Sequence, residues 1–160
     1  MFKVRIRGVD RVIRNLASAS DDVHDGARRG CNSAAEYLAK KIRAKFGKYN
    51  PTGGDPGGYG AWKRLKIATR IKKARKYGSG DNPLIATGET VGSITIVEGG
   101  VGRLAASVGL SGKIAYHVYG APGAGVPMRD PARVTAKEEK DQCHKIVEDY
   151  IREAMRRSGL

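Results

Sequence analysis

A helical pattern runs through residues 23–46, VHDGARRGCNSAAEYLAKKIRAKF. Its apolar residues recur every three or four positions, which places them along one face of a helix. They are Val23, Ala27, Cys31, Ala34, Leu38 and Ile42. Most of these side chains are small, so this face can pack closely onto a sheet or a neighbouring helix. Gly47 follows and is suited to end the helix, so we expect a core helix over residues 23–46.

The residues before this helix predict a strand and a short helix. Residues 2–7, FKVRIR, alternate apolar and basic side chains, which is the period of a strand with one buried face. Asp10 can cap a short helix over residues 10–16, whose apolar positions have helical spacing. The polar residues at 18–22 predict a break before the long helix begins.

The middle of the chain predicts a β-hairpin. Residues 94–96 have the composition of a strand, and the glycines at 99, 100 and 102 favour a turn. Residues 104–110 are then the returning strand, and residues 114–119 are a candidate third strand of this region.

A final helix is predicted from Thr135 onwards. Thr135 and Glu138 have the spacing of a capping box, and acidic residues in the early turns suit the helix dipole. We expect its apolar face to pack on the sheet, and this face consists of Cys143, Ile146, Val147, Tyr150, Ile151 and Ala154.

Together these elements predict helices and strands in one domain over residues 1–160. Residues 47–82 are expected to be a Gly-rich loop and a basic helical arm inserted in this domain. No apolar run approaches the roughly 20 residues that a membrane span requires, so we expect no membrane contact.

The excess positive charge is concentrated in residues 40–77. Thirteen of the 30 Lys and Arg residues lie there with one of the 16 acids, so this stretch carries +12 of the net +14. Residues 48–61, KYNPTGGDPGGYGA, predict an irregular loop. Residues 62–77 then predict a helix with a narrow apolar stripe among many cations. Such a helix is marginal alone, because like charges one turn apart repel.

The groups that catalysis requires do not converge in this sequence. His24 and His144 lie on helical patterns, and His117 has no cysteine or carboxylate at metal-ligand spacing. The glycine-rich segments contain no phosphate-binding loop motif. We therefore expect no enzyme activity, no cofactor and no metal site.

Three segments, taken in order, resemble the neck and tail-completion proteins of long-tailed bacteriophages, which include the head–tail joining and virion-morphogenesis proteins. The first is the opening strand and helix start, residues 2–16. The second runs from Trp62 through the basic helix to residues 83–94, PLIATGETVGSI. The third is residues 115–120, AYHVYG, followed by residues 126–129, VPMR.

The resemblance implies an α+β fold, in which an antiparallel sheet of about four strands packs against the long N-terminal helix and the C-terminal helix. It also implies a structural virion protein that joins capsid to tail as a neck, tail-completion or tail-terminator ring. It implies a homo-oligomeric ring, hexameric or dodecameric, whose partners are the neighbouring neck and tail proteins of the phage. It also implies assembly in the cytoplasm of the bacterial host, and a final location in the virion at the neck or tail end.

Within that interpretation the basic arm has two competing roles. It docks on protein through the apolar face of Trp62, Leu65 and Ile71, or it contacts DNA phosphates in the channel without reading sequence. Both roles use the same cations, which are Lys63, Arg64, Lys66, Arg70, Lys72, Lys73, Arg75 and Lys76. We favour protein docking, because an apolar stripe has no use against phosphates alone. A solvated face without any partner is a third alternative.

Two further expectations concern this region and the third motif. A nonspecific nucleic-acid-binding protein that uses the basic arm is the rival to the virion function. Arg129 follows the loop at residues 120–127, and we expect it to anchor that loop by hydrogen bonds to a neighbouring carbonyl or carboxylate.

Overall fold

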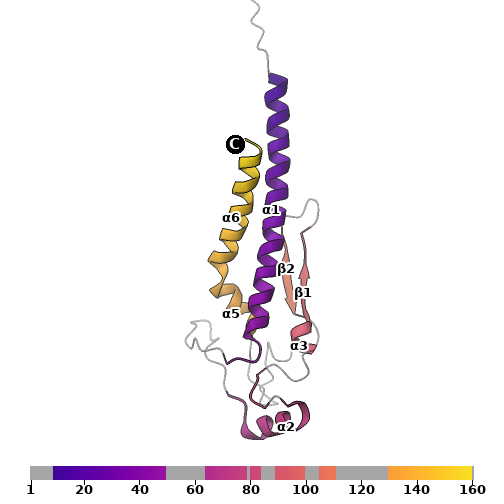
Figure 1. The fold of residues 1–160 in the computed structure, drawn as a ribbon, viewed down its shortest axis with the longest axis vertical. Coiled ribbons are helices and arrows are strands. Elements are labelled where there is room, and N and C mark those ends of the chain that lie inside the picture. The colour runs from indigo at the N-terminus through magenta and orange to yellow at the C-terminus, as the bar shows by residue number, and fades with distance from the viewer. Residues whose placement is uncertain are drawn as a thin grey trace, which may run out of the picture.

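The structure is a computed structural model that describes residues 9–49, 64–78, 80–83, 89–99, 105–110 and 130–159. Helices and strands follow one another as α1 (Val9–Lys45), α2 (Ile67–Tyr77), α3 (Glu89–Gly92), β1 (Ile94–Val97), β2 (Ser107–Leu110), α5 (Pro131–Glu138) and α6 (Lys140–Arg157) (Figure 1). The mixed helix and sheet class is confirmed. The expected strands at 2–7 and 114–119 lie outside the described residues, so a sheet of four strands stays a prediction.

The first helix, α1, is one continuous helix of 37 residues. The predicted break at residues 18–22 is therefore wrong. Serine and aspartate lower helix propensity only slightly, and this segment contains neither Gly nor Pro to interrupt the backbone. Tertiary contacts also support a continuous helix here, because Ala19 is buried and the Ser158 hydroxyl donates a hydrogen bond to Asp22 at 2.7 Å.

The last helix, α6, packs along α1 in the antiparallel direction (Figure 1). Contacts at its two ends show this direction, since Ser158 bonds to Asp22 and Glu139 bonds to Tyr37. The expectation that the apolar face of α6 packs on the sheet is thus wrong. Helix α6 lies instead against α1 at Gly26 and Gly30.

Two glycines bring these helices close together. A Cβ atom added at Gly26 would lie 2.7 Å from the Cβ of Ala154, and one added at Gly30 would lie 2.9 Å from the Cα of Val147. Both distances are shorter than real contacts, so a larger side chain at either position requires the helices to separate. The one-turn spacing of the two glycines places them on the same face of α1.

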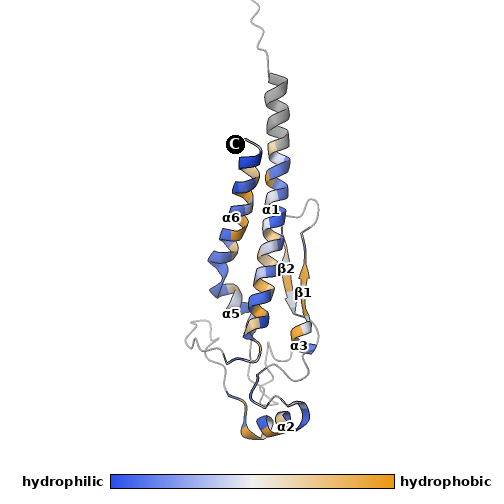
Figure 2. Ribbon diagram, in the orientation of Figure 1, coloured by the Kyte–Doolittle hydropathy of each residue, from blue (hydrophilic) through white to orange (hydrophobic). Residues whose placement is uncertain are grey.

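The two-stranded hairpin packs on the other side of α1 (Figure 1). Strands β1 and β2 form the predicted antiparallel hairpin, with Ile94 opposite Leu110 and Val97 opposite Ser107. The returning strand begins at Ser107, and residues 105–106, which the prediction included, are not part of it. The buried cluster between hairpin and helix consists of Ala39, Ile42, Phe46 and Ile94. The core thus lies at the C-terminal half of α1, and Figure 2 shows hydrophobic residues along β1 in this region.

The C-terminal helical region begins earlier than the capping pattern predicted. Asp130 is the N-cap of α5, and its carboxylate accepts a hydrogen bond from the backbone N–H of Arg133 at 3.0 Å. Pro131 occupies the first turn, where its missing N–H costs nothing. Thr135 lies inside α5, fully buried, and its hydroxyl donates to the Pro131 carbonyl at 2.6 Å. The predicted capping box of Thr135 and Glu138 is therefore wrong.

Candidate functional site

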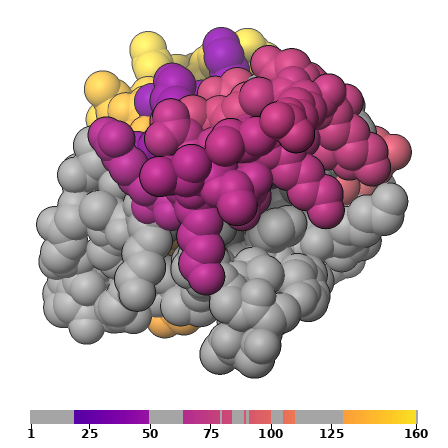
Figure 3. All heavy atoms as spheres, turned by 90° about the horizontal axis from the view of Figure 1, so that it is seen from below, coloured from indigo at the N-terminus to yellow at the C-terminus, as the bar shows by residue number. Residues whose placement is uncertain are grey.

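The basic helix α2 lies at the end of the molecule, near the C-terminal end of α1 (Figure 1). None of its residues is buried. Seen from that end, the side chains of α2 form an exposed surface (Figure 3). The helix has the expected type and position, although it begins at Ile67 rather than at residue 62.

The sequence specifies the N-terminal end of α2 weakly and its C-terminal end well. Lys66 occupies the N-cap position without a side-chain cap, and the first turn contains no acidic residue. At the other end Gly78 adopts a left-handed conformation with φ of 67°, and its N–H donates to the Ala74 carbonyl at 3.0 Å. Glycine suits this conformation because it lacks the Cβ atom that makes left-handed backbone costly.

One face of α2 is attached to its own chain by polar contacts. Asp81 forms an ion pair with Arg70 at 3.2 Å and accepts a hydrogen bond from the Tyr49 hydroxyl at 2.8 Å. The same Tyr49 oxygen accepts a hydrogen bond from the backbone N–H of Leu65 at 3.1 Å. Lys73 bonds to the carbonyl of Asn82. These contacts position α2 through residues on either side of it, without burying it.

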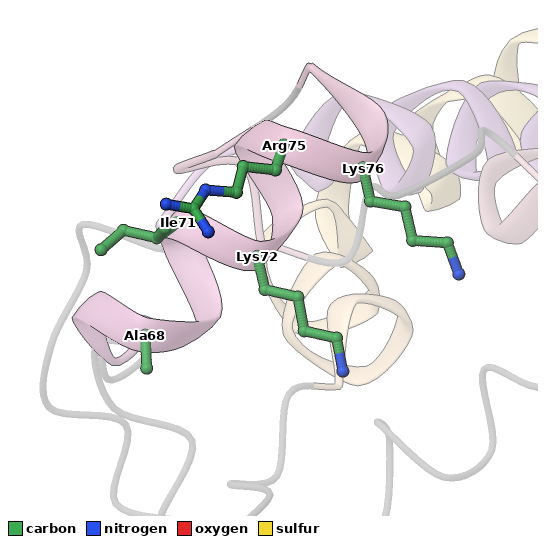
Figure 4. A pocket seen from close by; sticks show the side chains of 5 residues that line it. All are labelled: Ala68, Ile71, Lys72, Arg75 and Lys76. Atoms are coloured by element: carbon green, nitrogen blue, oxygen red, sulfur yellow. The ribbon is translucent and has the colours of Figure 1, made fainter.

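The opposite face of α2 is directed outward. An open hollow there is lined by residues spaced three or four apart on the helix, which are Ala68, Ile71, Lys72, Arg75 and Lys76 (Figure 4). Ile71 is 47% exposed and Ile67 is 73% exposed. In Figure 4 the Arg75 side chain extends toward Ile71, whereas Lys72 and Lys76 extend away from the helix in nearly the same direction. We call the surface of Ile67 and these five residues the outward face of α2.

The structure separates the sequence-predicted site residues into three groups. Lys72, Arg75, Lys76 and Ile71 lie together on the outward face. Arg70 and Lys73 are bonded to the chain itself, and Leu65 is half-buried. Arg64 and Lys66 are exposed just before α2. Trp62, Lys63 and Arg129 lie outside the described residues.

Two cations of the basic stretch bind acids of the C-terminal region, which sequence reasoning missed. Lys41 forms an ion pair with Glu139 at 3.0 Å, and Lys45 forms one with Glu138. The Tyr37 hydroxyl also donates to Glu139 at 2.5 Å. The acids expected to serve the helix dipole thus join α5 and α6 to α1. No local spacing could have revealed these pairs, because the partners are about a hundred positions apart in sequence.

These contacts shift ionisation at the junction. The hydrogen bond from Tyr37, together with Lys41, holds the pKa of Glu139 below its usual value. The hydrogen bond to Glu139 in turn raises the pKa of Lys41. The junction is therefore a stabilising polar cluster, since both shifts favour the charged forms that bind each other.

The described residues offer no arrangement typical of a metal site. Among them, no three His, Cys, Asp or Glu side chains gather closely enough to hold a metal ion. The charged hollow on α6 is a surface along one helix face, lined by Asp141, His144, Lys145, Glu148, Asp149 and Arg152. In the part of the chain that the structure describes, no helix has the length and apolar character of a membrane span.

Comparison of the chain with protein-family models, with curated proteins and with solved structures found no match. The resemblance described above thus depends on the ordered sequence motifs alone. The outward face of α2 is the candidate functional site, because it combines exposed apolar side chains with clustered charge.

Proposed function

We propose that this protein is a structural component of a tailed bacteriophage virion, and not an enzyme. In this proposal it forms a homo-oligomeric ring, hexameric or dodecameric, at the head–tail interface. The ring joins capsid to tail as a neck, tail-completion or tail-terminator protein. The proposed location is the virion, after assembly in the cytoplasm of the bacterial host.

One observation carries the proposal beyond the motifs. The apolar side chains of α2 remain exposed in the single chain, although that helix is ordered by contacts at its base. Exposed apolar side chains grouped with charge on one surface are typical of a surface that another protein covers. Repeated contacts around a closed ring would stabilise a subunit whose own core is small.

The oligomeric state tests this proposal directly. The purified full-length chain is expected to elute as a multimer whose mass, measured by light scattering, corresponds to a ring. Electron microscopy should show annular particles. A phage that lacks the gene should accumulate separate heads and tails. Normal infectious particles in its absence would contradict the proposal.

A second candidate is a nonspecific nucleic-acid-binding protein. It is favoured by one observation, namely that α2 contains five cations and no acid: Arg70, Lys72, Lys73, Arg75 and Lys76. Because Arg70 and Lys73 are bonded within the chain, fewer cations are available than the eight that the sequence suggested. If the three outward cations with Arg64 and Lys66 met phosphates, log affinity would fall with log salt with a slope of about −4.5. A flat salt response would eliminate this candidate.

A further inference from the structure

We infer that the outward face of α2 binds an acidic amphipathic segment of another protein, and this inference rests on the ring function proposed above. Such a segment would present apolar side chains to Ile67 and Ile71, with carboxylates beside them for Lys72, Arg75 and Lys76.

The apolar part of this face requires an apolar partner. Ile67 and Ile71 lie about one turn apart on α2, so their side chains form a continuous ridge. Both stay exposed in the full chain, in contrast to Ile42 of α1, which is 1% exposed. A partner that covers the ridge gains from removing this surface from water.

The charged part of the face favours a partner with negative charge. Arg75 lies three positions and Lys76 four positions after Lys72, so these cations flank the apolar ridge on one side of the helix. Like charges at these spacings repel each other in the free chain. Carboxylates opposite them would relieve the repulsion and add charge-assisted hydrogen bonds.

Nucleic acid and anionic membrane match this face less well. Phosphates would satisfy the cations but leave the isoleucine ridge uncovered. A membrane would cover the ridge, but α2 has only 11 residues and its outward face has two large aliphatic side chains, which is little for interfacial binding. A protein segment that carries both carboxylates and apolar side chains satisfies the two halves of the face together.

The test titrates the full-length protein with defined probes. The first is a fluorescent helical peptide in which leucines recur at alternating spacings of three and four residues, with a glutamate next to each leucine. The second replaces each leucine by serine and keeps every glutamate. A DNA duplex of about 20 base pairs and vesicles that contain phosphatidylserine complete the set.

Three variants separate the two halves of the face. The double variant Ile67→Ser/Ile71→Ser removes the ridge and keeps the charge. The triple variant Lys72→Gln/Arg75→Gln/Lys76→Gln removes the charge and keeps the ridge. The control variant Lys145→Gln/Arg152→Gln removes two exposed cations from α6, away from the site. Circular dichroism checks that each variant keeps its helix content.

We expect the leucine peptide to bind at least about tenfold more tightly than the serine peptide. Both site variants should weaken the leucine peptide by about tenfold or more, and the control should change its affinity less than twofold. The inference is overturned if the two peptides bind equally. It is also overturned if only DNA or only vesicles bind, or if the double variant binds the leucine peptide as the unaltered protein does.

The same samples keep this inference separate from the proposed function. Rings without peptide binding would refute the acidic partner and leave the ring standing. Peptide binding by a chain that stays monomeric would support the acidic partner and refute the ring.

Discussion

The helix pair α1–α6 and the isolated helix α2 are held in place by different physical means. The pair depends on close packing, because Gly26 and Gly30 let the α6 backbone approach α1 within van der Waals contact. Helix α2 buries none of its residues and depends on polar contacts at its base, chiefly through Asp81 and Tyr49. The pair is therefore expected to form with the rest of the fold, whereas α2 leaves its side chains exposed.

Helix α1 and the outward face of α2 also differ in amino-acid composition. Gly26 and Gly30 of α1 lie against α6, and most of the buried hydrophobic residues of α1 are alanines. The outward face of α2 has isoleucine and lysine side chains that project from the helix (Figure 4). Small residues thus mark the internal contact and long side chains mark the candidate external one.

Replacing an isoleucine by alanine should affect stability very differently in the core and on α2. Ile42→Ala removes a side chain from the core and should lower the free energy of unfolding by about 2–5 kcal/mol. Ile71→Ala, on α2, should change it by no more than about 0.5 kcal/mol. Urea denaturation followed by circular dichroism measures both. Equal losses for the two variants would mean that α2 belongs to the core.

Closing the space between α1 and α6 should have the next largest effect. Gly30→Ala places a methyl group against the Val147 backbone, so we expect a loss of about 1–2 kcal/mol even after the gain in helix propensity. Gly92→Ala is the matched control, because nothing lies within 4 Å of the added methyl group. A Gly30→Ala variant more stable than the parent would refute the close packing.

The tyrosine at the helix junction should contribute less. Tyr37→Phe removes the hydrogen bond to Glu139 and should cost about 1 kcal/mol at neutral pH. The folded-state pKa of Glu139 lies below the ordinary value of 4.5, so its contribution is present above that pH and is lost as pH falls through the lower value. Stability curves of the variant and the parent should therefore converge in acid.

The control for this experiment comes from α2. Tyr77→Phe alters a tyrosine that is 39% exposed, so it should leave stability unchanged at either pH. A gap between Tyr37→Phe and the parent that persists unchanged at low pH would show that the hydroxyl acts independently of the Glu139 charge.

The smallest effect on overall stability should come from the contacts at the base of α2. Asp81→Asn removes the ion pair with Arg70, and exposed pairs of this kind contribute about 0.5 kcal/mol or less. Hydrogen exchange measured by mass spectrometry should nevertheless show faster exchange in α2 than in the parent. Glu148→Gln, which removes an exposed pair on α6, should leave exchange in α6 unchanged. Unaltered α2 exchange would show that other contacts position this helix.

The sequence predicted local elements better than their partners. The hairpin and α2 follow from residue patterns within a few positions, so their existence could be predicted. The pairing of α6 with α1 could not, because Gly26 and Gly30 count against a helix by propensity alone. Their contribution to helix packing becomes visible only in the fold, where Val147 and Ala154, about 120 positions away in sequence, lie against them.

The candidate site could be predicted only in part, because local residue patterns indicate a helix but not its tertiary contacts. A narrow apolar stripe among many cations indicated a basic helix, and four of the predicted residues lie on its outward face: Ile71, Lys72, Arg75 and Lys76. Ile67, which is also exposed, was not predicted. Charge counting alone could not show that Arg70 and Lys73 bond within the chain, or that Lys41 and Lys45 bind Glu139 and Glu138. These pairings depend on tertiary register, which spacing within one helix does not contain.

A helix of 37 residues measures about 55 Å from end to end, almost twice the diameter of a small domain. The segment of α1 near Val9 continues past the end of α6, while α2 lies near the opposite end (Figure 1). If the proposed ring forms with α1 parallel to its axis, each subunit would span its full height. The ring could then contact one neighbouring protein at the end near Val9 and another at the end near α2.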